Sequence, residues 1–219
     1  MITLYGIKRI FPGGVGETKD LRVQWALEEM GLPYRVHGLD QPAGDLETDE
    51  FSRISPFHQI PLIDDEGFVV AESAAILIYL AEKAGKLIPS AVQGRTRVVQ
   101  WCFAAVSTIE PTLHALEMFE IFDSGKSAHA LKADVRMLAD RWFRDLERHL
   151  ANREWIAGAS FTVADILMAG VLRSIRQMDL MKPYPQIKAF FDRAHARPAW
   201  QRALELYAKR LGVNVDDIR

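Results

Sequence analysis

The chain has 219 residues and a formal net charge of -2; 49% of its residues are hydrophobic and 26% are charged. These values are ordinary for a globular chain of one large or two small domains, and they exclude the basic field of a typical nucleic-acid-binding protein. No apolar run reaches the roughly 18 residues that a membrane span needs, and the N-terminal residues do not have the pattern of a signal peptide. The one cysteine, Cys102, cannot form a disulfide within the chain. We therefore expect a cytoplasmic protein without disulfides or a membrane partner.

The first part of the chain alternates short apolar runs with one amphipathic segment. We predict a strand, a helix capped by Thr18, a second strand and a short helical turn, over residues 2–6, 18–30, 32–39 and 50–54. A glycine-rich loop over residues 9–17 precedes the helix. It is not a phosphate-binding loop, because no Gly-Lys-Ser/Thr follows at the required spacing. Strand, helix and strand in this order favour a small α/β sheet.

Residues 55–80 are the most informative stretch. Two apolar runs, 60–63 and 68–71, flank the acidic turn 64–67, in which Gly67 permits positive φ, so they predict an antiparallel hairpin. Glu72 and Ser73 then open an apolar helix. A helix N-terminus carries free N–H groups and a partial positive charge, so it binds carboxylates.

Pro61 stands at the front of the first hairpin strand, where it cannot donate a ladder hydrogen bond. It is therefore either an edge residue or a bend. A bend leaves the backbone of Ile60 free to pair with something other than a neighbouring strand. Free peptide backbone beside an anion-binding helix end predicts a pocket for a small acidic peptide.

The strand signal disappears after the linker-like residues 85–92. We predict helices over residues 95–122, with a kink at Pro111, and over 127–150, 184–196 and 198–211, with a further helix after Thr162. Thr162 and Asp165 have the spacing of a capping box. We interpret Asp165 as a structural acid and not a catalytic one.

Three segments together resemble the glutathione S-transferase family: Gln59-Ile60-Pro61-Leu62 with the acidic turn, Glu72-Ser73 with its helix, and residues 25–34. The resemblance implies an N-terminal thioredoxin-like α/β domain over residues 1–84, a linker over 85–92 and an all-helical domain over 93–219. It also implies a homodimer that binds glutathione. Gln59 belongs to the binding loop, Pro61 is cis, Ile60 pairs with the cysteinyl backbone, and Glu72 and Ser73 hold the γ-glutamyl end.

The family places a hydroxyl or thiol donor just before the first helix, where it favours the glutathione thiolate. Thr18 is the one hydroxyl at the mouth of this helix, since Tyr5 lies in the first strand and is expected in the core. Thr18 is either the activating residue or only a helix cap. N–H groups of the Gly13–Gly16 loop, or the positive charge of Lys19, are alternatives, although Lys19 can equally be a surface residue.

The remaining site predictions concern the glycyl end of glutathione and the pocket of the second substrate. His58 replaces a residue that is commonly glycine in the family; it either reaches the glycyl carboxylate of glutathione or lies on the surface. Ile10, Phe11, His114 and Met118 are expected to line the pocket of the second substrate. The histidines are dispersed without metal-ligand spacing, so no metal is expected.

The function that the resemblance implies is conjugation of glutathione to a small, hydrophobic electrophile, in detoxification. Two alternatives stay open. One is a glutathione-dependent peroxidase, isomerase or dehalogenase on the same site. The other is a non-enzymatic binding or interaction module with this fold. A disulfide-exchanging reductase is disfavoured, because no cysteine lies near Thr18.

Overall fold

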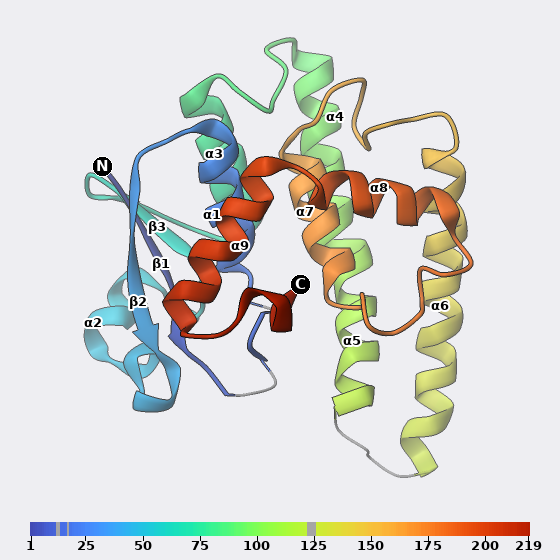
Figure 1. The fold of residues 1–219 in the computed structure, drawn as a ribbon, viewed down its shortest axis with the longest axis horizontal. Coiled ribbons are helices and arrows are strands. Elements are labelled where there is room, and N and C mark those ends of the chain that lie inside the picture. Colours follow the sequence, from blue (N-terminus) through green and yellow to red (C-terminus); the bar gives the residue numbers. More distant parts are fainter. Residues whose placement is uncertain (12–13, 17, 122–125) are drawn as a thin grey trace. The chain divides into compact units, whose positions relative to one another are not determined.

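A computed structural model describes residues 1–11, 14–16, 18–121 and 126–219 (Figure 1). The described chain groups into two compact units. Unit 1 comprises Met1–Lys86 and Ala196–Arg219, and unit 2 comprises Leu87–His195. The predicted fold class is confirmed: a small mixed α/β sheet comes first, and the part that follows is mostly helical.

Unit 1 is built on a four-stranded sheet with strand order β2-β1-β3-β4. The parallel pair is β1 (Ile2–Arg9) and β2 (Tyr34–Asp40), connected by α1 (Asp20–Met30). The antiparallel strands are β3 (Leu62–Asp65) and β4 (Phe68–Ala71), and β3 also pairs with β1. A parallel pair needs a crossover and an antiparallel pair only a tight turn, so these connections match the sheet's pairing.

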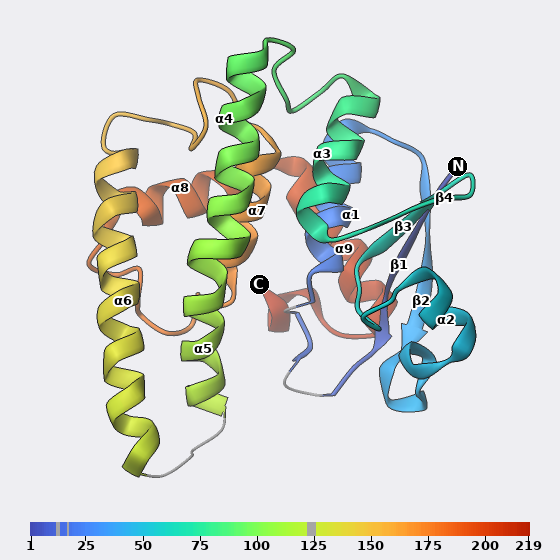
Figure 2. The ribbon, with the colours of Figure 1, turned by 180° about the vertical axis from the view of Figure 1, so that it is seen from behind.

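The two faces of the sheet are covered by different elements. Helices α1 and α3 (Ser73–Ala84) pack against each other and against β1 and β3, where Leu4 and Ile63 are fully buried. The opposite face carries Leu62 in a core cluster with Leu39, Leu46 and Phe51. Phe51 comes from α2 (Asp49–Ile54), which follows the short turns η2 (Gln41–Ala43) and η3 (Asp45–Glu47) (Figure 2).

Helix α9 (Pro198–Leu211) and the turn η5 (Val215–Ile218) complete unit 1. The sequence places this last helix in the domain 93–219, whereas the structure packs it on α1. Trp200 stacks edge-on against Trp25 at 4.9 Å between ring centroids. Arg197 and Arg202 form ion pairs with Glu29 and Glu28 of α1. The boundaries 1–84, 85–92 and 93–219 remain a proposal for the domains.

Unit 2 is helical. Helix α4 (Val92–Phe103) continues through a π-helical segment η4 (Ala104–Ile109) into α5 (Glu110–Ile121), and α6 (Lys126–Leu150), α7 (Val163–Arg173) and α8 (Pro185–His195) follow. The irregular segment ends at Ile109, two residues before Pro111, where the sequence predicts a kink. The Glu110 N–H bonds to the Ala105 carbonyl, and Pro111 has no N–H to continue the α pattern.

Several predicted boundaries are off by a few residues, and three of them lie close to the predicted site. Strand β1 runs on to Arg9, which ion-pairs with Asp40 and so belongs to the sheet and not to the loop. Strand β3 begins at Leu62, after Pro61. Helix α1 begins at Asp20 with Lys19 at its N-cap, and no side chain caps it, so Thr18 is not the cap.

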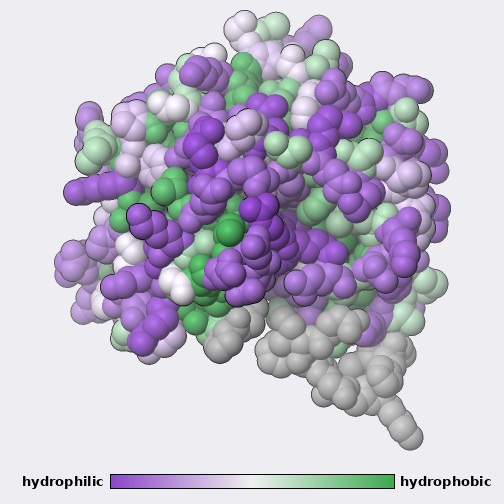
Figure 3. All heavy atoms as spheres, in the orientation of Figure 1, coloured by the Kyte–Doolittle hydropathy of each residue, from purple (hydrophilic) through white to green (hydrophobic). Residues whose placement is uncertain are grey.

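The surface is polar with scattered apolar residues. On the face shown in Figure 3, hydrophilic side chains dominate and hydrophobic ones are dispersed among them. Across the described ranges, no helix is long and apolar enough to cross a membrane.

Candidate functional site

The Ile60–Pro61 peptide bond is cis, as the family resemblance implies. Because Leu62 pairs with Ala71 in the hairpin, Pro61 lies next to Glu72, where α3 begins. Ile60 precedes the strand, and its N–H and C=O form no hydrogen bond within the described residues. The hairpin register therefore brings a free peptide group beside a helix N-terminus.

The loop before Pro61 is held by two side chains. Ser55 is buried, and its Oγ donates to the Gln59 carbonyl (2.8 Å) and accepts from the Gln59 N–H (3.0 Å). His58 has a positive φ of 54°, and its Nδ1 donates to the Leu46 carbonyl at 2.8 Å. The Gln59 side chain is exposed. These bonds fix the backbone on which Ile60 is presented.

The start of α3 has polar groups that the described chain does not use. Glu72 has φ 68° and ψ 116°, a backbone conformation that residues other than glycine rarely adopt. Its carboxylate is exposed and has no partner among the described residues. Ser73 is 7% exposed, and its hydroxyl also has no partner among these residues. With the first N–H groups of α3, they form a site suited to an amino-acid end, a carboxylate next to an ammonium.

The other end of the hairpin ties α3 to the sheet. The Asp65 carboxylate accepts hydrogen bonds from Lys83 and, at 2.6 Å, from the Tyr79 hydroxyl, both on α3. The Lys83 hydrogen bond, followed by that of Tyr79, lowers the pKa of Asp65 below its usual value. Asp65 is thus ionised at neutral pH and holds the helix against β3.

Thr18 lies just before α1 and faces α9. Its Oγ1 is 2.6 Å from the hydroxyl of Tyr207, a fully buried residue 189 positions later in the chain. The backbone N–H of Gly16 acts to lower the pKa of this phenol. Burial raises the pKa of Tyr207 to about 12, so the phenol keeps its proton at neutral pH.

A buried ion pair lies beneath Thr18. Asp20 is completely buried, and its Oδ2 accepts from Arg210 of α9 at 2.5 Å. Burial raises the pKa of Asp20, while Arg210 and then Thr18 act in the opposite direction. Arg210 also donates to Gln24, which donates to Tyr34. This network joins α9 to α1 and β2.

The other predicted site residues lie as follows. Lys19 is exposed and Gly13 lies outside the described residues, while Gly14 and Gly16 are buried. Ile10 and Phe11, both with exposed surface, belong to unit 1. Met118 and the exposed His114, which contacts Glu117, belong to unit 2. The pocket that these four residues were predicted to form stays a prediction.

Two further features bear on the chemistry. Cys102 is buried in α4, and burial raises the pKa of its thiol to about 12. It is therefore a poor nucleophile at neutral pH. Within the described ranges, no group of three or more His, Cys, Asp and Glu side chains has the arrangement of a metal site.

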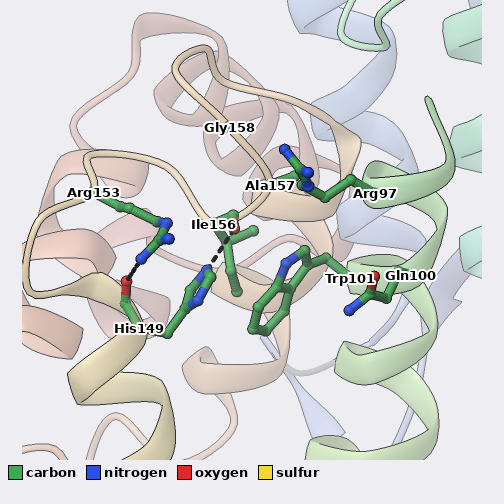
Figure 4. Close-up of a pocket in the computed structure, with 8 residues that line it drawn as sticks. All are labelled: Arg97, Gln100, Trp101, His149, Arg153, Ile156, Ala157 and Gly158. Carbon is green, nitrogen blue, oxygen red and sulfur yellow. Dashed lines mark hydrogen bonds between the residues drawn. The ribbon is translucent and has the colours of Figure 1, made fainter. Parts of the chain in front are cut away.

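Unit 2 contains a separate cavity of about 400 Å³ (Figure 4). Arg97, Gln100 and Trp101 of α4 line it, opposite His149 at the end of α6 and the segment that follows. His149 Nε2 donates to the Ile156 carbonyl at 2.8 Å, and its ring lies 4.4 Å from that of Trp101. None of the predicted site residues lines this cavity.

The sequence matches two family descriptions. The glutathione S-transferase N-terminal domain matches residues 21–83, and the glutathione S-transferase C-terminal domain matches residues 116–205. The chain belongs to the glutathione S-transferase family. The first match covers the cis-proline loop and the start of α3 in this transferase-family chain, but it begins after Thr18 and Lys19.

Individual relatives agree. Over 186 residues the chain is 32% identical to the disulfide-bond oxidoreductase YfcG of Escherichia coli, covering 81% of this chain and 86% of that one. It is 32% identical to glutathione S-transferase D7 of Drosophila melanogaster, covering 84% and 83%. A crystal structure of a glutathione transferase family member from Pseudomonas fluorescens, with two glutathione bound, has a TM-score of 0.82 and 31% identity, covering 93% and 92%.

Sequence reasoning missed three of the supporting residues. Ser55 fixes the loop, and a Ser-Pro pair before a predicted turn is a signal that could have found it. Tyr207 and Arg210 reach α1 from the last helix. Their positions in the sequence carry no sign of this contact.

Proposed function

We propose that this protein binds reduced glutathione in unit 1 and conjugates its thiolate to a small, hydrophobic electrophile. One observation supports this above the others. The pairing of Leu62 with Ala71 places three polar groups next to one another: the backbone of Ile60 beside cis-Pro61, the Glu72 carboxylate and the Ser73 hydroxyl. None of them has a partner among the described residues. The Pseudomonas fluorescens relative, which binds glutathione, supports the same ligand.

Each end of the tripeptide has a matching group. The γ-glutamyl carboxylate accepts hydrogen bonds from the first N–H groups of α3 and from the Ser73 hydroxyl. The γ-glutamyl ammonium pairs with the Glu72 carboxylate. The cysteinyl N–H and C=O pair with Ile60, as strands pair. His58 is proposed to reach the glycyl carboxylate through Nε2, because Nδ1 is already bonded to Leu46. Gln59 and Pro61 shape the loop that presents Ile60.

Thr18 is proposed to donate a hydrogen bond to the glutathione sulfur. A free thiol has a pKa of about 8.5, so only a few per cent is thiolate at neutral pH. Lowering that pKa by about one unit needs about 1.4 kcal/mol of preference for the anion. The sulfur attacks the electrophilic carbon, the carbon–sulfur bond forms, and the leaving group departs with the bonding pair. The Gly13–Gly16 loop and Lys19 are the alternative activators.

A second candidate is glutathione-dependent reduction of a disulfide, and the similarity to the disulfide-bond oxidoreductase favours it. One glutathione thiolate attacks the disulfide and releases a thiolate. A second glutathione then attacks the mixed disulfide, so two thiols supply the two electrons and leave as glutathione disulfide. The step needs no protein cysteine, which agrees with the buried, high-pKa Cys102.

Steady-state assays separate the two reactions. Purified protein is assayed with glutathione and either 1-chloro-2,4-dinitrobenzene or 2-hydroxyethyl disulfide, with Cys102→Ala as a control outside the site. Conjugation that exceeds disulfide reduction supports the first proposal. Disulfide reduction alone, unchanged in Cys102→Ala, supports the second. Glutathione binding without either activity supports the interaction module, and no binding contradicts the proposal.

Ile10, Phe11, His114 and Met118 are proposed to contact the electrophile, through their apolar and aromatic surface. A cytoplasmic homodimer with a role in detoxification is proposed from the family resemblance, and sedimentation velocity tests the dimer.

A further inference from the structure

Thr18 can help the thiolate only if its single proton points to the sulfur. A hydroxyl has one proton and two acceptor lone pairs. In this structure Thr18 has two other neighbours that can accept that proton, the phenol oxygen of Tyr207 and the carboxylate of Asp20. What Tyr207 does with its own proton therefore decides what Thr18 can donate.

The contacts of Tyr207 favour one direction for the 2.6 Å hydrogen bond. The backbone N–H of Gly16 acts to lower the pKa of the phenol, which makes its hydroxyl a better donor. A phenol is also a stronger hydrogen-bond donor than an aliphatic alcohol. Tyr207 is fully buried on α9, which packs beside α1 (Figure 1), so its ring is held in place. These features suit a phenol that donates its proton to Thr18.

We propose that Tyr207 is a positioning residue that donates its proton to Thr18 Oγ1 and so leaves the Thr18 proton for the sulfur of bound glutathione. The inference rests on the proposed role of Thr18. No covalent bond is broken in this arrangement. Tyr207 and Thr18 both keep their protons, and the Thr18 hydroxyl donates a hydrogen bond to the thiolate.

Asp20 is the competing acceptor for the Thr18 proton. Arg210 occupies Oδ2 of this carboxylate at 2.5 Å, while Oδ1 is buried without a hydrogen bond of normal geometry. The Arg210 guanidinium stabilises the negative charge of Asp20, which weakens its attraction for the Thr18 proton. The thiolate of bound glutathione has no such cationic partner. It therefore competes with Asp20 as the acceptor of the Thr18 proton.

The test is the pKa of the thiol of bound glutathione, followed by ultraviolet absorbance of the thiolate against pH. Four proteins make a double-mutant cycle: wild type, Thr18→Val, Tyr207→Phe and the double variant. Valine and phenylalanine keep the shape and remove only the hydroxyl. Tyr184→Phe, a buried tyrosine of unit 2, is the matched control.

Thr18→Val is expected to raise the thiol pKa by about one unit, and Tyr207→Phe by about half a unit. The double variant is expected to equal Thr18→Val, because without Thr18 the phenol has nothing to orient. A residue that only supports the fold would give additive effects. Thr18→Ser, which restores the hydroxyl, is expected to keep the wild-type pKa.

The outcomes separate the two claims. If the pKa of the glutathione thiol rises in Thr18→Val but not in Tyr207→Phe, Tyr207 has no positioning role and Thr18 remains the activator. Unchanged pKa values in both variants, with glutathione still bound by calorimetry, overturn both the role of Thr18 and this inference, but not the glutathione site. If Tyr207→Phe fails to fold, replacing Tyr207 with 3-fluorotyrosine tests the direction of the bond, because this residue keeps the ring and its hydroxyl is a stronger hydrogen-bond donor. The thiol pKa is then expected to fall, and an unaltered thiol pKa contradicts the proposed direction.

Discussion

Two helices of this protein begin in opposite ways. At the start of α7, the Asp165 carboxylate accepts from the Ile156 and Thr162 N–H groups and from the Thr162 hydroxyl, all within 2.9 Å. At the start of α3, Glu72 and Ser73 make no side-chain hydrogen bond within the described residues. A helix start whose polar groups are satisfied internally serves the fold, whereas unused groups at a strained backbone are available to a ligand.

The largest effect is expected at the satisfied helix start. Asp165→Ala leaves two N–H groups and a hydroxyl buried without an acceptor, so it should lower the free energy of unfolding by about 3 kcal/mol. Urea denaturation measures this, with Ser73→Ala as the matched change at α3. A loss of similar size in Ser73→Ala would remove the distinction between the two helix starts.

The pH dependence of stability sharpens the same contrast. Burial raises the pKa of the Asp165 carboxyl from its ordinary 3.8 to about 6. The folded state therefore holds this proton more tightly, and the stabilisation is complete below pH ~4 and lost as the pH rises through about 6, an effect of about 2 to 3 kcal/mol. Unfolding of wild type and Asp165→Asn between pH 4 and 7 measures it. Parallel curves for the two proteins would contradict the assignment.

A smaller effect is expected where the binding loop is held. Ser55→Ala removes both hydrogen bonds to Gln59, so the loop that presents Ile60 becomes less ordered. We expect about tenfold weaker glutathione binding, and about 1 kcal/mol lower stability. Ser52→Ala, which removes an exposed hydrogen bond in α2, is the control. Equal affinities in the two variants would show that the loop needs no such support.

The smallest effect concerns backbone strain. Glu72→Gly relieves the positive φ of 68° and should raise the free energy of unfolding by about 0.5 to 1 kcal/mol while weakening glutathione binding. Glu72→Gln keeps the strain and loses the charge. A gain in stability without loss of affinity would mean that the carboxylate does not touch the ligand.

The sequence was most informative where chemistry is local. The hairpin, the cis-proline loop and the Thr162–Asp165 capping box follow from turn residues, from proline's missing N–H and from a three-residue spacing. Contacts between distant segments carry no such signal. The packing of α9 on α1, and the Tyr207–Thr18 hydrogen bond across 189 positions, depend on how the helices pack. The sequence pattern places the start of α1 at Thr18, because a threonine before a helix predicts a cap. In the structure the helix begins at Asp20, and the Thr18 hydroxyl contacts the phenol of Tyr207 instead.

The central claim is that the unused groups at the start of α3 bind glutathione. Calorimetric titration of reduced glutathione into wild type and Ser73→Ala tests it most directly, with Ser160→Ala as a control in unit 2. We predict one glutathione per chain in wild type, at least tenfold weaker binding in Ser73→Ala, since a hydrogen bond to a carboxylate is worth about 1.5 to 3 kcal/mol, and no change in the control. Absence of binding in wild type, or equal affinity in Ser73→Ala, would contradict the claim.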